Sequence, residues 1–376
     1  MNLPAEIGHR GRRDMRRRKF LGSVGIGAAA TTLAAPAIAQ SAPQITWRLQ
    51  SAFPTSFAAL YPAATTMAKY VEEMTEGRFR IQPFAAGEIV GPNQIADAVA
   101  QGTVEMGHTA SQYYHGKDPA FSLGTLLPFG FNTRMMDAWQ MQGGGLDLLN
   151  TFYAKHGFFA LPGGNVTAQM GGWYRKEINS VSDLAGLKMR VGGLPGSIMA
   201  KMGVVPTAIP GGDVYVSLER GTIDAAEFTG PFDEERMGLN KVAPYYYFPS
   251  WWEGQAAVHF FMNLQKWEEL PAHYKAILRA AAAVAADEVV TRYDYGNPAA
   301  LVRLISSGAQ LRNFNEEIIA TALAASKEVY AELNETNPEW KTLYDSIVEY
   351  RDSAYAYWQL TELSYDAMMA RLRTQL

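Results

Sequence analysis

Hydrophobic positions between residues 45 and 227 alternate between a two-residue spacing and a spacing of three to four residues. Ile45–Leu49 alternates like a strand, and Phe57–Met74 has the spacing of a helix that Gly77 ends. The same order recurs downstream, where the pattern predicts strands at 188–191 and 204–209 and helices at 195–202 and 214–220. Short strands that alternate with helices indicate an α/β fold.

One helix–glycine–strand unit occurs twice. Residues 98–105 read AVAQGTVE, and residues 217–224 read SLERGTID. Glycine commonly ends a helix that leads into a strand, which is one interpretation of the match. The other interpretation is that the chain has two similar α/β lobes with a ligand cleft between them. Because ligands bind outside the carboxyl ends of such strands, residues 109–114 and 227–231 would then form the cleft.

Helical spacing predominates after Leu270. Pro271–Tyr293 is rich in alanine, and Glu316–Leu333 is amphipathic. Beyond Asn337, an apolar stripe predicts one long helix over residues 340–376, built on Leu343, Ile347, Tyr350, Ala354 and Tyr357. The stripe packs either on its own lobe or on a second subunit, and the sequence leaves both interpretations open.

Residues 1–39 have the three parts of an export signal. Arg16–Lys19 is basic, Gly22–Leu33 is small and apolar, and Ala37–Ala39 is an A-x-A cleavage site. The order of residues 17–21, RRKFL, resembles a twin-arginine signal; an ordinary secretory signal is the alternative. Because the apolar run is shorter than the ~20 residues that span a bilayer, we expect the signal to be cleaved and the mature protein to reside in the periplasm.

Composition narrows the range of partners. Removing residues 1–39 takes away seven of the 33 basic residues and two of the 37 acidic ones, which leaves 26 bases, 35 acids and a net charge of −9. This balance disfavours nucleic acid as a partner. The chain has no cysteine, so disulfides, thiol catalysis and cysteine-bound metals are excluded.

Catalytic motifs are absent from the sequence. It contains no G-x-S-x-G elbow, no H-E-x-x-H, no P-loop and no G-x-G-x-x-G after a predicted strand. The five histidines after residue 39 show no ligand-like spacing. We therefore expect a binding protein and no enzyme. The alternative from another class is an enzyme exported by the twin-arginine route.

Four segments carry the candidate binding groups. Asn165 and Gln169 lie in a glycine-rich tract where backbone can approach a ligand closely. Arg190 lies between two apolar residues of a predicted strand, and its planar fork suits a carboxylate; a structural salt bridge is the alternative. Glu227 follows two alanines at a strand end, where it is paired, protonated, metal-bound or solvated. The fourth is an aromatic run at 245–254 with one acid, which forms either core or cleft wall.

The block from Gly163 to Phe261 resembles the solute-binding proteins of TRAP (tripartite ATP-independent periplasmic) transporters, in particular the branch that binds 2-oxo or 2-hydroxy monocarboxylates. The motifs are QMGGW at 169–173, LKMRVGG at 187–193, PGG at 210–212, IDAAE at 223–227 and YYFP at 246–249. HTAS at 108–111, GKDPA at 116–120 and LPFG at 127–130 extend the resemblance over nearly the whole mature chain.

The resemblance implies a two-lobed α/β periplasmic binding protein of the Venus flytrap type (type II-like). A long helix would bridge the lobes, and a C-terminal helical extension would follow. We expect lobe I at 40–162 plus about 249–288, lobe II at 163–248 plus about 289–339, and the C-terminal helix at 340–376. The partners of such a protein would be a small carboxylate and the membrane subunits of a TRAP transporter. A second copy of the chain would bind through the C-terminal helix.

The resemblance also implies site roles. Arg190 would clamp the ligand carboxylate, and Gln169, Glu227 and the backbone carbonyl of Phe228 would bind a cation that bridges to the ligand. The family usually has Trp where Phe228 stands, so the cleft wall is reshaped here. Oxygen donors of this kind suit Na⁺ or Ca²⁺. We add Asn165, Phe228 and Trp252 as ligand contacts and Glu253 as a cation ligand. The expected ligand is a 2-oxo acid such as pyruvate; lactate or another 2-hydroxy acid with Ca²⁺ is the alternative.

Overall fold

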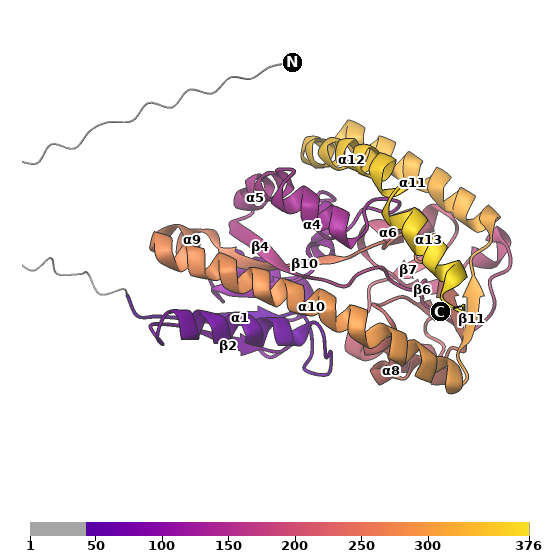
Figure 1. Ribbon diagram of the computed structural model, residues 1–376, viewed down its shortest axis with the longest axis horizontal. Helices are drawn as coiled ribbons and strands as arrows, with labels where there is room; N and C mark the ends of the chain where they lie inside the picture. Colours follow the sequence, from indigo (N-terminus) through magenta and orange to yellow (C-terminus); the bar gives the residue numbers. More distant parts are fainter. Residues whose placement is uncertain (1–42, 376) are drawn as a thin grey trace, which may run out of the picture. The chain divides into compact units, whose positions relative to one another are not determined.

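The computed structural model describes residues 43–375, so the predicted export signal lies outside the described residues. Within them, helices cover two β-sheets (Figure 1). One sheet has five strands in the order β2-β1-β3-β10-β4, and the other has six in the order β11-β9-β5-β8-β6-β7. Each sheet mixes parallel and antiparallel pairs. The predicted two-lobed α/β fold is confirmed.

The first sheet belongs to lobe I and consists of β1 (Ile45–Ser51), β2 (Phe79–Phe84), β3 (Met106–Thr109), β4 (Phe158–Asn165) and β10 (Ala257–Asn263). The second belongs to lobe II and consists of β5 (Trp173–Tyr174), β6 (Lys188–Arg190), β7 (Val205–Thr207), β8 (Ala225–Ala226), β9 (Tyr245–Phe248) and β11 (Gln310–Asn313). The α-helices are α1 (Tyr61–Met74), α2 (Ile95–Ala100), α3 (Phe121–Thr125), α4 (Thr133–Met141), α5 (Gly145–Lys155), α6 (Gly193–Lys201), α7 (Val214–Glu219), α8 (Pro231–Met237), α9 (Leu264–Glu269), α10 (Ala272–Ser306), α11 (Glu316–Thr336), α12 (Pro338–Trp358) and α13 (Glu362–Leu372).

The repeated helix–glycine–strand unit occurs once in each lobe. Its first copy is α2 followed by β3, and its second copy is α7 followed by β8. The glycines between them, Gly102 and Gly221, have φ angles of 73° and 70°. This left-handed conformation favours glycine, so local backbone geometry explains why the residue recurs in both copies.

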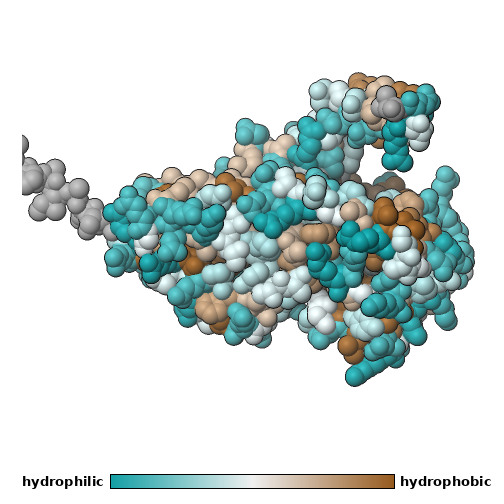
Figure 2. Space-filling view, turned by 60° about the horizontal axis from the view of Figure 1, so that its bottom comes forward, coloured by the Kyte–Doolittle hydropathy of each residue, from teal (hydrophilic) through white to brown (hydrophobic). Residues whose placement is uncertain are grey.

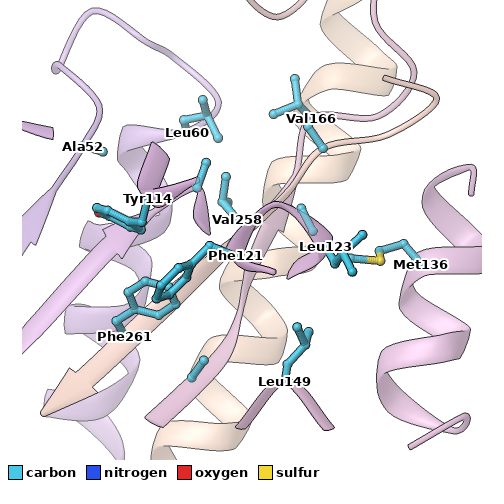
Figure 3. Packing of buried hydrophobic residues seen from close by; sticks show 14 of the residues in the cluster. Ala52, Leu60, Tyr114, Phe121, Leu123, Met136, Leu149, Val166, Val258 and Phe261 are labelled. Carbon is cyan, nitrogen blue, oxygen red and sulfur yellow. The ribbon is translucent and has the colours of Figure 1, made fainter. Parts of the chain in front are cut away.

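Aromatic and aliphatic side chains fill the core of lobe I. Figure 3 shows Tyr114, Phe121 and Phe261 in contact there. The ring of Tyr114 lies 5.8 Å from that of Phe121 and 6.1 Å from that of Phe261, centroid to centroid. Burial of such side chains contributes roughly 1.5–3 kcal/mol each to the stability of the lobe I core.

Helix α10 connects the two lobes. It packs on α1 and β4 of lobe I and on α8 of lobe II (Figure 1). The alanine-rich pattern predicts a helix that ends at Tyr293, whereas α10 continues to Ser306 with Pro298 inside it. Contacts with α8 extend the helix: a Cβ on Gly296 would lie 2.5 Å from the Phe232 ring, and the Asn297 side chain accepts a 2.9 Å hydrogen bond from the Phe232 N–H.

The C-terminal segment forms two helices, so the expectation of one continuous helix over 340–376 is wrong. Helix α12 buries Trp340, Leu343 and Ile347 among its neighbours, which include α4, α5 and α11. No side chain of α13 is buried. The apolar stripe continues in sequence, but its burial ends at Ala354, and the helix breaks after Trp358 where tertiary contacts no longer hold it.

Exposed hydrophobic side chains are mostly scattered over the surface. On the face shown in Figure 2, hydrophilic residues predominate and hydrophobic ones form small separate groups. Among residues 43–375, no helix has the length and apolar character needed to cross a membrane.

We expect acid to destabilise the fold through two buried histidines. His108 of β3 and His259 of β10 are fully buried, and desolvation lowers their pKa values to about 3 and about 4. The unfolded chain therefore binds more protons than the folded one below pH 6.5, and stability falls as the pH drops from there towards 4. Each histidine contributes about 1.4 kcal/mol per pH unit. Urea unfolding across this range measures the loss, and His108→Gln should reduce its slope; an unchanged slope would contradict the assignment.

Candidate ligand-binding site

A cavity of about 490 Å³ lies between the lobes, at the carboxyl ends of their strands. Lobe I contributes the loop after β1 and the residues after β3, and lobe II contributes the ends of β6 and β8. The predicted cleft segments 109–114 and 227–231 therefore both reach it, through Gln112, Tyr113, Glu227 and Phe228. This agrees with the rule that α/β sheets bind ligands outside their strand ends.

A second compartment of about 30 Å³ adjoins the first. Gln169 and Glu253 line only this smaller compartment. Six residues line both and separate them: Phe53, Gln112, Tyr113, Arg190, Glu227 and Phe228. The smaller space exceeds the 10–15 Å³ needed for one water molecule, so it has room for a small ion.

Arg190 and Glu227 form a buried ion pair in the wall between the compartments. Strands β6 and β8 run parallel with Arg190 opposite Ala226, which places the next residue, Glu227, beside the guanidinium. The Nη1 atom of Arg190 donates to the Glu227 carboxylate and, at 2.6 Å, to its backbone oxygen. Its Nε atom donates to Ile209, and its guanidinium carbon lies 4.9 Å from the centre of the Phe228 ring. Contacts with Glu227, Ile209 and Phe228 thus hold the Arg190 guanidinium in place.

The smaller compartment brings two buried carboxyl groups together beside a single arginine. Glu227 and Glu253 are 6% and 3% exposed. Burial raises the pKa of Glu227 despite the nearby Arg190. The pKa of Glu253 is raised well above its usual range by burial and then by the charge of Glu227. Two carboxyl groups share one arginine, so the site is short of one positive charge or holds one proton.

Unpaired oxygen atoms lie in the same place. Gln169 Oε1 and Glu253 Oε2 are buried without a hydrogen-bond partner among the described residues. Backbone bonds hold the two loops together: Gln169 N donates to Glu253 O at 3.1 Å, and Ser250 N donates to Gln169 O at 3.2 Å. Buried polar atoms are rarely left unpaired in native proteins. Carboxylate and amide oxygens with surplus negative charge fit a hard cation.

Carboxylate and imidazole side chains alone do not form a complete metal site among the described residues. Residues 43–375 contain no cluster of three or more His, Cys, Asp or Glu side chains arranged to hold a metal. A cation would therefore depend on the Gln169 amide and on backbone carbonyls as well as on Glu227 and Glu253. The donor set consists only of oxygens, which fits Na⁺ or Ca²⁺ and disfavours softer metals.

Comparison of the sequence with known protein families identifies the family of this chain. Residues 54–337 match the model of the bacterial extracellular solute-binding proteins, family 7 (DctP). The chain belongs to this family. It is also 42% identical to the monocarboxylate 2-oxoacid-binding periplasmic protein of Nostoc sp., across 94% of this chain and 98% of that protein.

Solved structures of family 7 proteins share the fold. A TRAP transporter solute-binding protein from Bordetella bronchiseptica RB50 is 41% identical, with a TM-score of 0.87 over 89% of this chain and 99% of its own; it is described as a mixed-occupancy dimer with copurified calcium and picolinate. A TRAP periplasmic solute-binding protein from Pseudoalteromonas atlantica T6c, with bound sodium and pyruvate, is 36% identical, with a TM-score of 0.83 over 86% of this chain and 98% of its own. This chain is therefore an extracytoplasmic TRAP solute receptor.

The family 7 site gathers most of the residues singled out in the sequence. Gln169, Arg190, Glu227, Phe228 and Glu253 all line the compartments. Asn165 and Trp252 line neither of them. Asn165 instead accepts hydrogen bonds from Thr167 N and Ala256 N and donates to Gln255, and Trp252 is fully buried against other aromatic rings.

Among the aromatic lining residues of this solute-binding protein, Phe53 and Phe57 were not predicted from the sequence. Both follow β1. Gln112 and Tyr113, which follow β3, lie in the predicted cleft segment 109–114. The rule that ligands meet strand ends also holds for β1, and it indicates the loop that contains both phenylalanines.

The surplus carboxyl group gives a testable pH dependence. Because burial and the charge of Glu227 raise the folded pKa of Glu253 well above its ordinary value of 4.5, the folded protein binds the extra proton, and stability falls as the pH rises above 4.5. Glu253→Gln should remove a slope of roughly 1.4 kcal/mol per pH unit from the free energy of unfolding of the ligand-free protein. The exposed Glu335→Gln is the matched control and should keep the slope. If the free energy of unfolding has the same pH dependence in the wild type and in Glu253→Gln, Glu253 does not hold the extra proton.

Proposed function

We propose that this receptor captures a small 2-oxo acid such as pyruvate together with Na⁺ or Ca²⁺ and delivers both to the membrane subunits of a TRAP transporter. The observation that supports it is the buried pair of carboxyl groups with unpaired oxygens beside a single arginine. The Nostoc, Bordetella and Pseudoalteromonas relatives, described with 2-oxoacids, calcium and picolinate, and sodium and pyruvate, support the same ligand class.

Charge explains why the acid and the cation would bind together. A ligand carboxylate beside Glu227 adds a repulsion of roughly 4 kcal/mol for unit charges ~4 Å apart at an intermediate dielectric. Arg190 offsets one negative charge, and its Nη2 atom makes no hydrogen bond within residues 43–375. Gln169, Glu227, Glu253 and the carbonyl of Phe228 would hold the cation. The cation supplies the missing positive charge and favours acids with an oxygen at carbon 2.

The larger compartment has room for organic acids bigger than pyruvate. One water molecule occupies ~30 Å³ of liquid, so 490 Å³ holds far more atoms than pyruvate has. Apolar side chains of Phe53, Phe57 and Ile209 line this space. We propose that it accepts 2-oxo acids with longer apolar chains. The site binds through charge and hydrogen bonds, so we propose that the receptor performs no chemistry on them.

We also propose that α13 carries a dimer contact. Leu363, Tyr365 and Leu372 of this helix are 63%, 58% and 40% exposed, and no side chain of the helix is buried. Exposed apolar residues gathered on one element often mark a protein interface. The Bordetella relative is described as a dimer, which supports the pairing.

Removal of the cation should abolish acid binding. We expect pyruvate, titrated by calorimetry after divalent ions are removed and Na⁺ is replaced by a bulky organic cation, to lose most of its affinity. Glu227→Gln should weaken cation and pyruvate binding together, because each completes the site of the other. Acetate and propionate serve as matched controls and should bind far more weakly than pyruvate. Undiminished pyruvate affinity without cation would rule out the bridging role.

Removal of α13 should produce monomers. A chain ending at Gln359 keeps α12 and its buried Trp340 and Leu343, so the core stays intact. Sedimentation velocity should show a dimer for the mature chain and a monomer for the truncated one. If both sediment as monomers, the α13 contact is wrong; if both sediment as dimers, the interface lies elsewhere.

A further inference from the structure

A fully buried carboxylate connects the two lobes beside the cavity. Asp233 lies in the first turn of α8 in lobe II and is 0% exposed. Its Oδ1 atom accepts a 3.0 Å hydrogen bond from the backbone N–H of Ala58, which precedes α1 in lobe I. Its Oδ2 atom accepts a 2.6 Å bond from the hydroxyl of Tyr293, in the lobe-bridging helix α10. One side chain thus joins lobe I, lobe II and the helix between them.

The segment that carries Asp233 also carries the binding residues. Glu227 and Phe228 line both compartments, and α8 begins three residues later. The next acid, Glu234, fixes this segment to lobe II: it accepts from Thr229 N at 3.0 Å, from Trp173 Nε1 at 3.1 Å and from the Tyr246 hydroxyl. These bonds fix residues 227–234 to lobe II as one segment. The residues that line the compartments lie at one end of the segment, and Asp233 lies near the other.

A second contact crosses between the lobes next to this bond. The ring of Phe57 lies 5.0 Å from the ring of Phe228, centroid to centroid. Phe57 and Ala58 are adjacent, so one short loop of lobe I makes both contacts with segment 227–234. An open arrangement of the lobes would break both contacts, and the Asp233 carboxyl group would exchange the Ala58 donor for water, which loses the net stabilisation of that hydrogen bond.

We infer that Asp233 is the latch of the closed form: its bond to the Ala58 N–H holds the lobes together once residues 227–234 are in place. The inference concerns closure and does not depend on which acid is bound. Asp233 lines neither compartment, and its hydrogen bonds go to Ala58 and Tyr293, so it acts on binding through the position of the lobes. It is therefore a positioning residue.

Closure can be measured by fluorescence energy transfer in the mature chain. The protein has no cysteine, so dyes can be placed at Glu73→Cys in α1 and Lys176→Cys after β5, both exposed. We expect Asp233→Ala to lower the closed-to-open ratio of the ligand-free protein roughly tenfold or more, the range for hydrogen bonds to a charged group. With Ca²⁺ and pyruvate present, affinity should fall by a similar factor, and the dissociation rate should carry most of the change.

Matched variants separate the latch from general damage. Glu235→Gln changes another acid of α8, whose carboxylate accepts hydrogen bonds from Arg303 of α10. This variant should leave the closed-to-open ratio unchanged. Asp233→Asn keeps an acceptor for Ala58 and should retain most of the closure. Should Asp233→Ala fail to fold, Ala58→Pro removes the donor from the other lobe.

Hydrogen exchange gives an independent readout. The peptide containing Ala58 should exchange several-fold faster in Asp233→Ala than in the wild type. An unchanged energy-transfer distribution in Asp233→Ala and Ala58→Pro, or an equal shift in Glu235→Gln, overturns the latch. Because the ligand-free measurements need no bound acid, a failure of pyruvate to bind would count against the proposed function and leave this test decisive.

Discussion

Two carboxyl groups buried beside one arginine set the character of this receptor. Glu227 and Glu253 both lie in the wall of a small compartment, and Arg190 balances only one of them. Such an arrangement is unfavourable unless a proton or a cation joins it. The fold tolerates it because the strand ends and two mutually bonded loops hold the groups in place before anything binds. The carboxyl groups are thus held together by the fold itself, which is the arrangement on which the proposed cation and acid binding rests.

The rest of the molecule keeps that wall in position. Parallel pairing of β6 with β8 fixes the Arg190–Glu227 distance, and the loops before β5 and β10 bring Gln169 and Glu253 to the same point. Helix α10 gives the two lobes a common support through α1, β4 and α8.

The sequence predicts the chemistry of the site better than its boundaries. Arg190 and Glu227 could be recognised because a charged residue among apolar neighbours must have a partner. Trp252 could not be distinguished from a cleft residue, since core and cleft walls use the same aromatic side chains. Phe57 carries no polar signal, and the role of Asp233 depends on Ala58, 175 residues away in the chain. The end of α10 and the break before α13 depend on tertiary packing, which local spacing does not encode.

Both compartments are lined by residues of both lobes. Neither lobe alone holds the complete set of contacts. Any change in the separation of the lobes therefore divides the site itself, so occupancy of the site and the separation of the lobes are linked quantities. In this receptor, affinity is a property of the arrangement of the lobes as much as of any side chain.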